Sequence, residues 1–85
     1  MNLGVYGYIA TVRPLNIKKV RVGLPMTVVG QCHVNCIGIT EAEFYQELVA
    51  SIQLNMFEQA DRLGISLGNT RQVVAVIDFL KVEDK

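Results

Sequence analysis

A single long helix is the feature of this sequence that most restricts its fold. The segment Thr40-Glu41-Ala42-Glu43 matches a capping box, in which the Thr40 hydroxyl accepts from the Glu43 amide and the Glu43 carboxylate reaches back to the Thr40 amide. Apolar residues then recur at helical spacing, at Tyr45, Leu48, Val49, Ile52, Met56, Ala60 and Leu63. Gly64 follows, where a left-handed C-terminal cap is expected. The sequence therefore predicts a helix over residues 41–63.

Strand-like segments lie on both sides of this helix. Residues 3–13 are rich in β-branched and aromatic types and stop at Pro14, which cannot donate to a sheet ladder. Residues 17–22 and 26–39 alternate from one face to the other, as strands do. Residues 71–82 are apolar on both faces, which is typical of a central strand covered on both sides.

The predicted element order is β-β-β-α-β, which belongs to the α+β class. We expect a four-stranded, mostly antiparallel sheet with one long helix packed on one face. If the helix crosses over the sheet, the last strand should run parallel to the third by a right-handed connection. The chain has 85 residues, which suits a single small domain over residues 1–85 and leaves no room for a separate catalytic lobe.

Composition and the chain ends restrict the class of protein further. Hydrophobic residues make up 51% of the chain and charged residues 19%, so the sequence is that of a folded domain and not of a disordered segment. No apolar run approaches the roughly 18 residues that a membrane span needs, and the N-terminal residues lack the basic region and the cleavage site of a secretory signal. We therefore expect a cytoplasmic protein that does not enter a membrane.

The segment Cys32-His33-Val34-Asn35-Cys36 is the first candidate for chemistry, because thiolates and imidazole bind soft metals. In an extended strand the two cysteines lie about 13 Å apart, whereas a disulfide needs Cα atoms within about 7 Å. His33 also points to the opposite face, and a fourth ligand is missing. We interpret both cysteines as small core residues and expect no metal and no cofactor. A strand break that brings the cysteines together is the alternative.

Catalytic motifs are absent from the sequence. The chain has one histidine, and no serine, cysteine or threonine stands in a nucleophile signature. Its glycines form neither a dinucleotide-binding pattern nor a P-loop. We therefore expect that the protein is not an enzyme.

The charges are unevenly distributed along the chain. Residues 1–39 carry four basic and no acidic residues, whereas residues 40–85 carry four basic and eight acidic ones. The basic residues Arg13, Lys19 and Arg21, together with His33, are candidates for binding a small anionic ligand such as a nucleotide. Four basic residues are few for a nucleic-acid-binding domain, so we expect no nucleic-acid partner. The alternative is a positively charged sheet edge that resists aggregation.

Apolar residues remain that one helix on one sheet face does not cover. Val74, Val76 and Leu80 are placed on the second face of the last strand. Leu54 and Phe57 lie outside the apolar stripe of the helix. Exposed apolar patches usually mark interfaces, so we expect these five residues to lie in a homo-oligomer interface. Single hydrophobic residues scattered over a monomer are the alternative.

These observations favour a non-catalytic, homo-oligomeric binding protein. Such a protein acts through its assembled surface, as an accessory, regulatory or inhibitor protein, and its partner is another protein. The alternative function is binding or sequestering a small anionic ligand at a basic junction between subunits.

Overall fold

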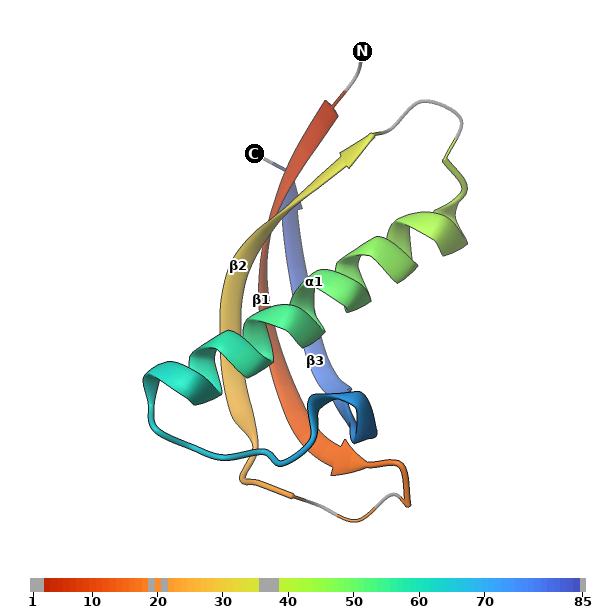
Figure 1. Ribbon diagram of the computed structural model, residues 1–85. Coiled ribbons are helices and arrows are strands. Elements are labelled where there is room, and N and C mark those ends of the chain that lie inside the picture. Colours follow the sequence, from red (N-terminus) through yellow and green to blue (C-terminus); the bar gives the residue numbers. More distant parts are fainter. Residues whose placement is uncertain (1–2, 19, 21, 36–38, 85) are drawn as a thin grey trace.

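The computed structural model describes residues 3–18, 20, 22–35 and 39–84. Its elements are, in chain order, β1 (Leu3–Asn16), β2 (Met26–Asn35), α1 (Glu41–Arg62), the short 3-10 helix η1 (Thr70–Gln72) and β3 (Val73–Asp84). The strands form one antiparallel sheet in the order β2-β1-β3, and α1 crosses one face of it obliquely (Figure 1). The described residues are thus a compact α+β domain, as the sequence predicts.

The prediction of a strand over residues 17–22 is wrong for the part of that segment that the structure describes. Ile17 and Lys18 form a turn, and Val20 and Val22 lie in irregular backbone. The side-chain oxygen of Asn16 accepts hydrogen bonds from the amides of Lys18 and Val20, at 2.9 and 3.0 Å, and folds the chain back on itself. The described order is therefore β-β-α-β with three strands, in place of the predicted four.

β1 is the central strand, and it continues through Pro14, where the sequence predicts its end. β1 pairs with β2 from Leu3 to Val12 and with β3 from Tyr6 to Asn16. The Pro14 carbonyl accepts from the Val22 amide at 3.0 Å, on the side where β2 no longer pairs. Because the N and O atoms of a strand residue point to the same side, the missing amide of Pro14 breaks no bond with β3.

β3 is an edge strand, whereas the sequence predicts a central strand covered on both sides. β2 and β3 are both antiparallel to β1 and so run in the same direction, as predicted for the two strands joined by the helix. β1 lies between them, so the two strands are parallel without being neighbours. One edge of β3 therefore has no strand partner among the described residues.

The start and end of the helix are confirmed, but the capping box is confirmed only in part, because the Glu43 carboxylate bonds to the Thr40 hydroxyl in place of the predicted Thr40 amide. The Glu43 amide donates to the Thr40 hydroxyl at 3.2 Å, and that hydroxyl donates to the Glu43 carboxylate at 2.9 Å. α1 ends at Arg62, and Gly64 adopts the expected left-handed conformation with φ of +70°.

The core lies between α1 and the sheet. From the predicted apolar stripe of the helix, Leu48, Ile52, Met56 and Ala60 are buried. Tyr45 and Leu63 were predicted in the same stripe but are 51% and 62% exposed. Both are near the ends of a helix that crosses the sheet obliquely and extends past it on each side (Figure 1).

A β-bulge in β3 changes which face its residues occupy. Val12 of β1 pairs with Ile77, but the next residue back, Thr11, pairs with Phe79, so Asp78 is an extra residue. Leu80 consequently packs against the buried core on the helix side. The prediction that Leu80 shares a face with Val74 and Val76 is wrong, because the bulge at Asp78 interrupts the alternation of side chains between the two faces of the strand.

Candidate interaction surfaces

Three neighbouring apolar side chains lie exposed on the sheet face opposite the helix. Val29, Phe79 and Ile9 are 64%, 55% and 44% exposed. Ile9 is paired with Val29 across the β1–β2 ladder, and Phe79 is paired with Thr11, two residues along β1 from Ile9. These residues form one connected patch, which we call the open sheet face.

Ion pairs border the open sheet face. Arg13 Nε lies 2.7 Å from Asp78 Oδ2, and Lys81 Nζ lies 3.2 Å from Glu83 Oε1. Because Gly7 has no side chain, a hollow of about 140 Å³ lies beside it, lined in part by Ile9, Val29, Lys81 and Glu83. The face therefore combines an apolar centre with paired charges of both signs, a composition found in protein interfaces.

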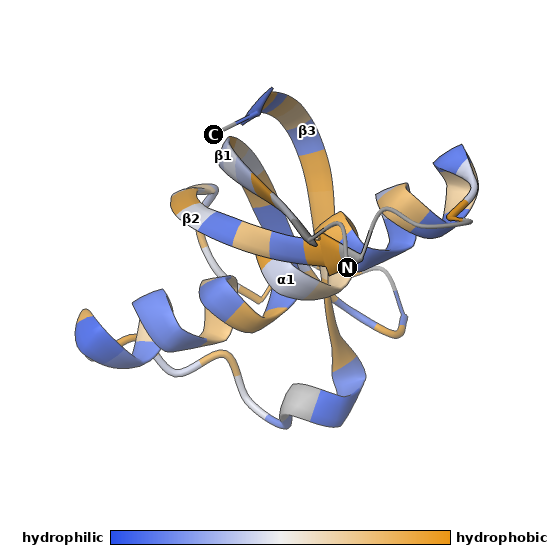
Figure 2. Cartoon of the chain, turned by 90° about the horizontal axis from the view of Figure 1, so that it is seen from above, coloured by the Kyte–Doolittle hydropathy of each residue, from blue (hydrophilic) through white to orange (hydrophobic). Residues whose placement is uncertain are grey.

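A second apolar surface follows one side of α1. It consists of Tyr45, Gln46, Val49, Ala50, Gln53, Leu54 and Phe57, which line a broad groove of about 700 Å³. We call this surface the helix flank. Its seven residues carry no charge, and Leu54 and Tyr45 are its most exposed large hydrophobic residues. The hydropathy colouring shows hydrophobic and hydrophilic residues interleaved along α1 (Figure 2).

A third apolar groove lies where the connection between β1 and β2 meets the segment after the helix. It has a volume of about 480 Å³, and its lining includes Leu24, Leu63 and Ile65. These three side chains are 76%, 62% and 43% exposed. Polar groups are scarce here, so the groove offers little that would orient a small ligand.

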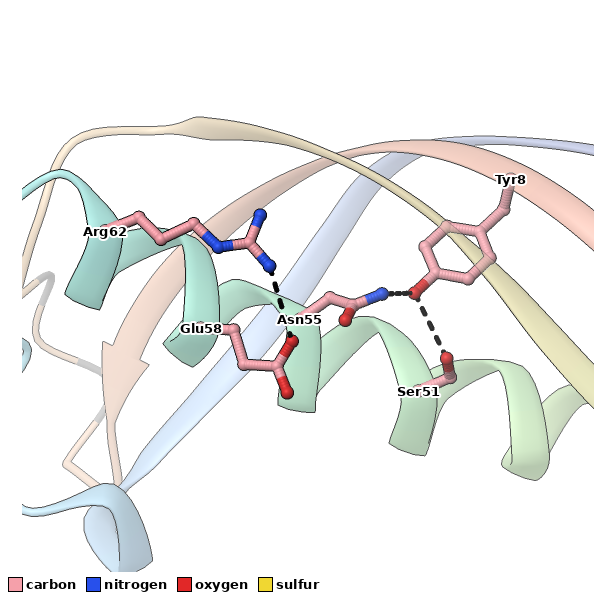
Figure 3. Close-up of polar contacts among 5 residues, drawn as sticks. All are labelled: Tyr8, Ser51, Asn55, Glu58 and Arg62. Atoms are coloured by element: carbon pink, nitrogen blue, oxygen red, sulfur yellow. Dashed lines mark hydrogen bonds and ion pairs between the residues drawn. The ribbon is translucent and has the colours of Figure 1, made fainter.

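The polar side chains between helix and sheet bond to one another. The Tyr8 ring reaches from β1 to α1, where its hydroxyl bonds with Ser51 Oγ at 3.1 Å and accepts from the Asn55 amide (Figure 3). One turn further along α1, Glu58 and Arg62 form a 4.0 Å ion pair. Tyr8 is 2% exposed, so its hydroxyl holds the helix on the sheet and does not face a substrate.

Cys32 is a core residue, as predicted. Its side chain is buried, and its thiol donates to the Glu47 carbonyl at 3.7 Å. Burial raises the pKa of the Cys32 thiol, the Glu47 carboxylate raises it further, and a hydrogen bond with Ser51 partly opposes both effects. At neutral pH the thiol is therefore protonated and a poor nucleophile. Cys36 lies outside the described residues, so its distance from Cys32 stays a prediction.

The residues predicted to bind an anion do not converge within the described part of one chain. Arg13 is ion-paired with Asp78. His33 is exposed on β2 opposite Val5, which is eight residues from Arg13 along β1, or roughly 26 Å in an extended strand. Lys19 and Arg21 lie outside the described residues. An anion site formed by these four residues stays a prediction.

The residues predicted at an oligomer interface lie in three places: the helix flank, the side of β3 opposite the helix, and the helix side of β3. Leu54 and Phe57 belong to the helix flank. Val74 is 45% exposed and Val76 is half-buried. Leu80 packs on the helix side. A homo-oligomer interface at these residues stays a prediction.

The sequence prediction missed several exposed apolar residues. On the open sheet face it missed Ile9, Val29 and Phe79. Val29 shares one side of its strand with Gln31 and His33, and such mixed polarity signals a partly apolar exposed surface. On the helix flank it missed Tyr45 and Val49, which the helical period places in the core stripe.

Metal binding, membrane spans and similar proteins give no further indication of the function. In the described ranges, no three histidine, cysteine or acidic residues form a group that could hold a metal ion. No helix in the described part of the chain combines the length and the apolar character needed to cross a bilayer. Comparison of the chain with protein-family models, with curated proteins and with solved structures found no match.

Proposed function

We propose that the protein is a non-catalytic binding protein that works as a homo-oligomer, in an accessory, regulatory or inhibitory role. The supporting observation is that exposed apolar residues gather on two sides of the sheet, at the helix flank and at the open sheet face. A small chain gains from burying such surfaces, because large exposed apolar patches are uncommon on soluble monomers. One surface serves self-association and the other presents the assembly to a partner protein.

The nature of the polar groups supports a role without catalysis. The Tyr8 hydroxyl bonds to both Ser51 and Asn55 at the contact between helix and sheet. The buried Cys32 thiol is kept protonated. The ion pairs Arg13–Asp78 and Lys81–Glu83 neutralise side chains on the open sheet face. A catalytic site needs a free nucleophile or base beside a cleft, and these groups already serve structural contacts.

Native mass spectrometry of the protein as purified from cells tests this proposal, and light scattering over a range of concentrations supports it. The expected species is a whole-number multiple of the 9.4 kDa chain with no added mass. A bare monomer at every concentration would contradict the homo-oligomer.

An added mass of a few hundred daltons per site would instead favour the alternative function, in which the protein sequesters a small anionic ligand. In that case Arg21→Glu should abolish the thermal stabilisation given by the ligand without changing the oligomer size. Stabilisation that survives this substitution would place the ligand elsewhere.

A further inference from the structure

We propose that the helix flank pairs with the helix flank of a second copy, in an antiparallel helix pair around a two-fold axis close to Ala50. The proposal rests on the homo-oligomer proposed above and assigns that homo-oligomer to one surface. It leaves the open sheet face uncovered for a partner.

The distribution of charge on α1 favours an uncharged occupant for the flank. From Tyr45 to Phe57 the residues lining the groove are uncharged. The acidic residues Glu43, Glu47, Glu58 and Asp61 fall within an arc of about 60°, centred about 90° from the middle of the flank. Leu54, at one border of the flank, lies within this arc; over the rest of the uncharged lining, a charged partner group would lose solvation with no charge opposite it. A second copy presents the same uncharged surface.

The order of residues on the flank makes it self-complementary. Two rows follow the four-residue ridges of the helix, Tyr45-Val49-Gln53-Phe57 and Gln46-Ala50-Leu54. In an antiparallel second copy each row runs in the opposite direction. Read in that direction, the first row still has an aromatic ring at each end, and the second row still has its small residue in the middle. The midpoints of the two rows fall within one residue of each other, so a single two-fold axis serves both.

This axis fixes which residues meet. Tyr45 packs on Phe57 of the second copy, and Val49 packs on its Gln53. Ala50 lies against Ala50 of the second copy, where a small side chain lets the two helices approach closely. Packing of four-residue ridges on both helices gives a crossing angle of about −50°, the commonest class between helices in globular proteins. The contact is isologous, as a closed dimer requires.

The sheet leaves room for a second helix beside α1. On the β2 side, Gln59 Nε2 donates to the Thr27 carbonyl at 2.7 Å and the Cys32 thiol bonds to the Glu47 carbonyl. On the β3 side, the contact between Gln53 Oε1 and the Ala75 amide is long, at 3.5 Å. Leu80, which faces the helix side of β3, is only half-buried. A second helix along the flank would cover this side of the sheet as well.

The size of the flank sets the strength of the dimer. Seven partly exposed side chains on each copy are far fewer than the roughly 20 to 30 residues that each partner contributes to a standard interface, so the contact is small and the dimer is weak. We therefore expect a dissociation constant in the micromolar range, with exchange between monomer and dimer over roughly 0.1 to 100 μM protein.

Cysteine cross-linking tests the geometry directly, in a Cys36→Ser background in which Cys32 stays buried. Under mild oxidation, Ala50→Cys should form a covalent species of twice the chain mass. Glu58→Cys, on the acidic arc, is the matched control and should stay a single chain. Tyr45→Cys should cross-link with Phe57→Cys when the two variants are mixed, but not with itself. Self-linking of Tyr45→Cys would indicate parallel helices and overturn the proposed arrangement.

Charge substitution gives a second, independent measurement. Leu54→Glu places two carboxylates, one from each copy, in the uncharged interface, and should weaken the dimer by at least about thirty-fold in sedimentation velocity. Circular dichroism checks that the variant stays folded. Phe79→Lys, on the open sheet face, is the control and should leave the dissociation constant unchanged.

The two proposals fail in different ways. An oligomer whose mass is unchanged by Leu54→Glu, and that forms no cross-link at Ala50→Cys, would overturn the flank pairing and leave the homo-oligomer standing. A wild-type protein that stays monomeric up to about 100 μM would overturn both. Loss of the dimer in Phe79→Lys alone would assign self-association to the open sheet face.

Discussion

Gly30 determines how closely the helix approaches the sheet. It lies in β2 directly opposite Tyr8, whose ring crosses toward α1. A Cβ atom at position 30 would lie 2.8 Å from the Tyr8 hydroxyl oxygen and would also meet the Asn55 amide. A glycine inside a strand indicates either a bulge or a close approach. At Gly30 the structure shows a close approach and no bulge, since the β1–β2 register is continuous at this position.

Gly30→Ala should therefore destabilise the fold by about 1 to 3 kcal/mol, the usual cost of overpacking a filled site. The measurement is urea unfolding followed by circular dichroism. Gln31→Ala, at the next and exposed position, is the control and should change the free energy of unfolding by less than about 0.5 kcal/mol. The double variant Gly30→Ala, Asn55→Ala should recover part of the loss, because it removes one of the clashing groups. Equal losses at positions 30 and 31 would contradict the close approach.

Cys32 gives the stability of the protein a dependence on pH. Because its pKa is raised in the folded state, the thiol loses its proton more readily in the unfolded chain. Its contribution to stability is complete below the ordinary thiol pKa of about 8.5 and is lost as the pH rises through the folded-state pKa.

The free energy of unfolding of the wild type should therefore fall more steeply above about pH 8.5 than that of Cys32→Ala. Urea unfolding at several pH values measures the difference, and taking it against Cys32→Ala removes the effect of lysine and tyrosine titration. Parallel curves for the two proteins would show that the folded-state pKa of Cys32 is not raised.

At the scale of elements, the ends of the helix were predictable from neighbouring residues. The turn after Asn16 and the bulge at Asp78 were not. The capping box and Gly64 fix the ends of α1 through contacts within a few residues, so the sequence alone locates the helix. Residues 17–22 alternate like a strand, but the Asn16 side chain bonds to the amides of Lys18 and Val20 and makes a turn. The bulge at Asp78 has no glycine or proline to indicate it.

Deletion of Asp78 tests the bulge. Removing the extra residue leaves Ile77 opposite Val12 and Phe79 opposite Thr11, so every side chain of β3 keeps its face. Only the exposed ion pair with Arg13 is lost, and the free energy of unfolding should change by about 1 kcal/mol or less.

Deletion of Val76, a residue in the regular part of β3, is the matched comparison. It moves Val73 and Ala75 from the buried face to the open one, and should cost about 2 to 4 kcal/mol. Thermal unfolding of both variants measures the difference. If deletion of Asp78 costs as much as deletion of Val76, residue 78 is not an extra residue in the ladder.

At the scale of the whole molecule, the oblique path of α1 decides which apolar residues stay exposed. The helical period alone groups Tyr45 with the buried Ile52, but the buried residues follow the oblique ridge Leu48-Ile52-Met56-Ala60, which leaves Tyr45 51% exposed beside it. A crossing angle arises from packing between elements, and no local pattern encodes it. Leu54 was predictable as exposed because it lies opposite the buried stripe. That the residues of the helix flank form one connected surface was not predictable from the sequence.

The sheet order also makes the fold depend on contacts between distant parts of the chain. β1 pairs with β3 across the whole sequence, and the Arg13–Asp78 ion pair joins residues 65 positions apart. The two ends of the described chain come close together, because Tyr6 pairs with Asp84 (Figure 1). Two-state proteins with many such non-local contacts fold slowly, because closing the long loop costs entropy before the contacts form.

A circular permutant tests this dependence. Joining residue 84 to residue 3 by a short glycine-serine linker, and opening the chain between Gly68 and Asn69, turns the sheet into a β3-β1-β2 meander of neighbouring hairpins. Its refolding in stopped-flow experiments should be several-fold faster than that of the wild type, because every strand pair becomes local. A second permutant with the same linker, opened between Gly23 and Leu24, makes the β1–β3 pair local but the β1–β2 pair distant, and should refold at close to the wild-type rate. Equal refolding rates for the two permutants would mean that strand pairing across the chain does not limit folding.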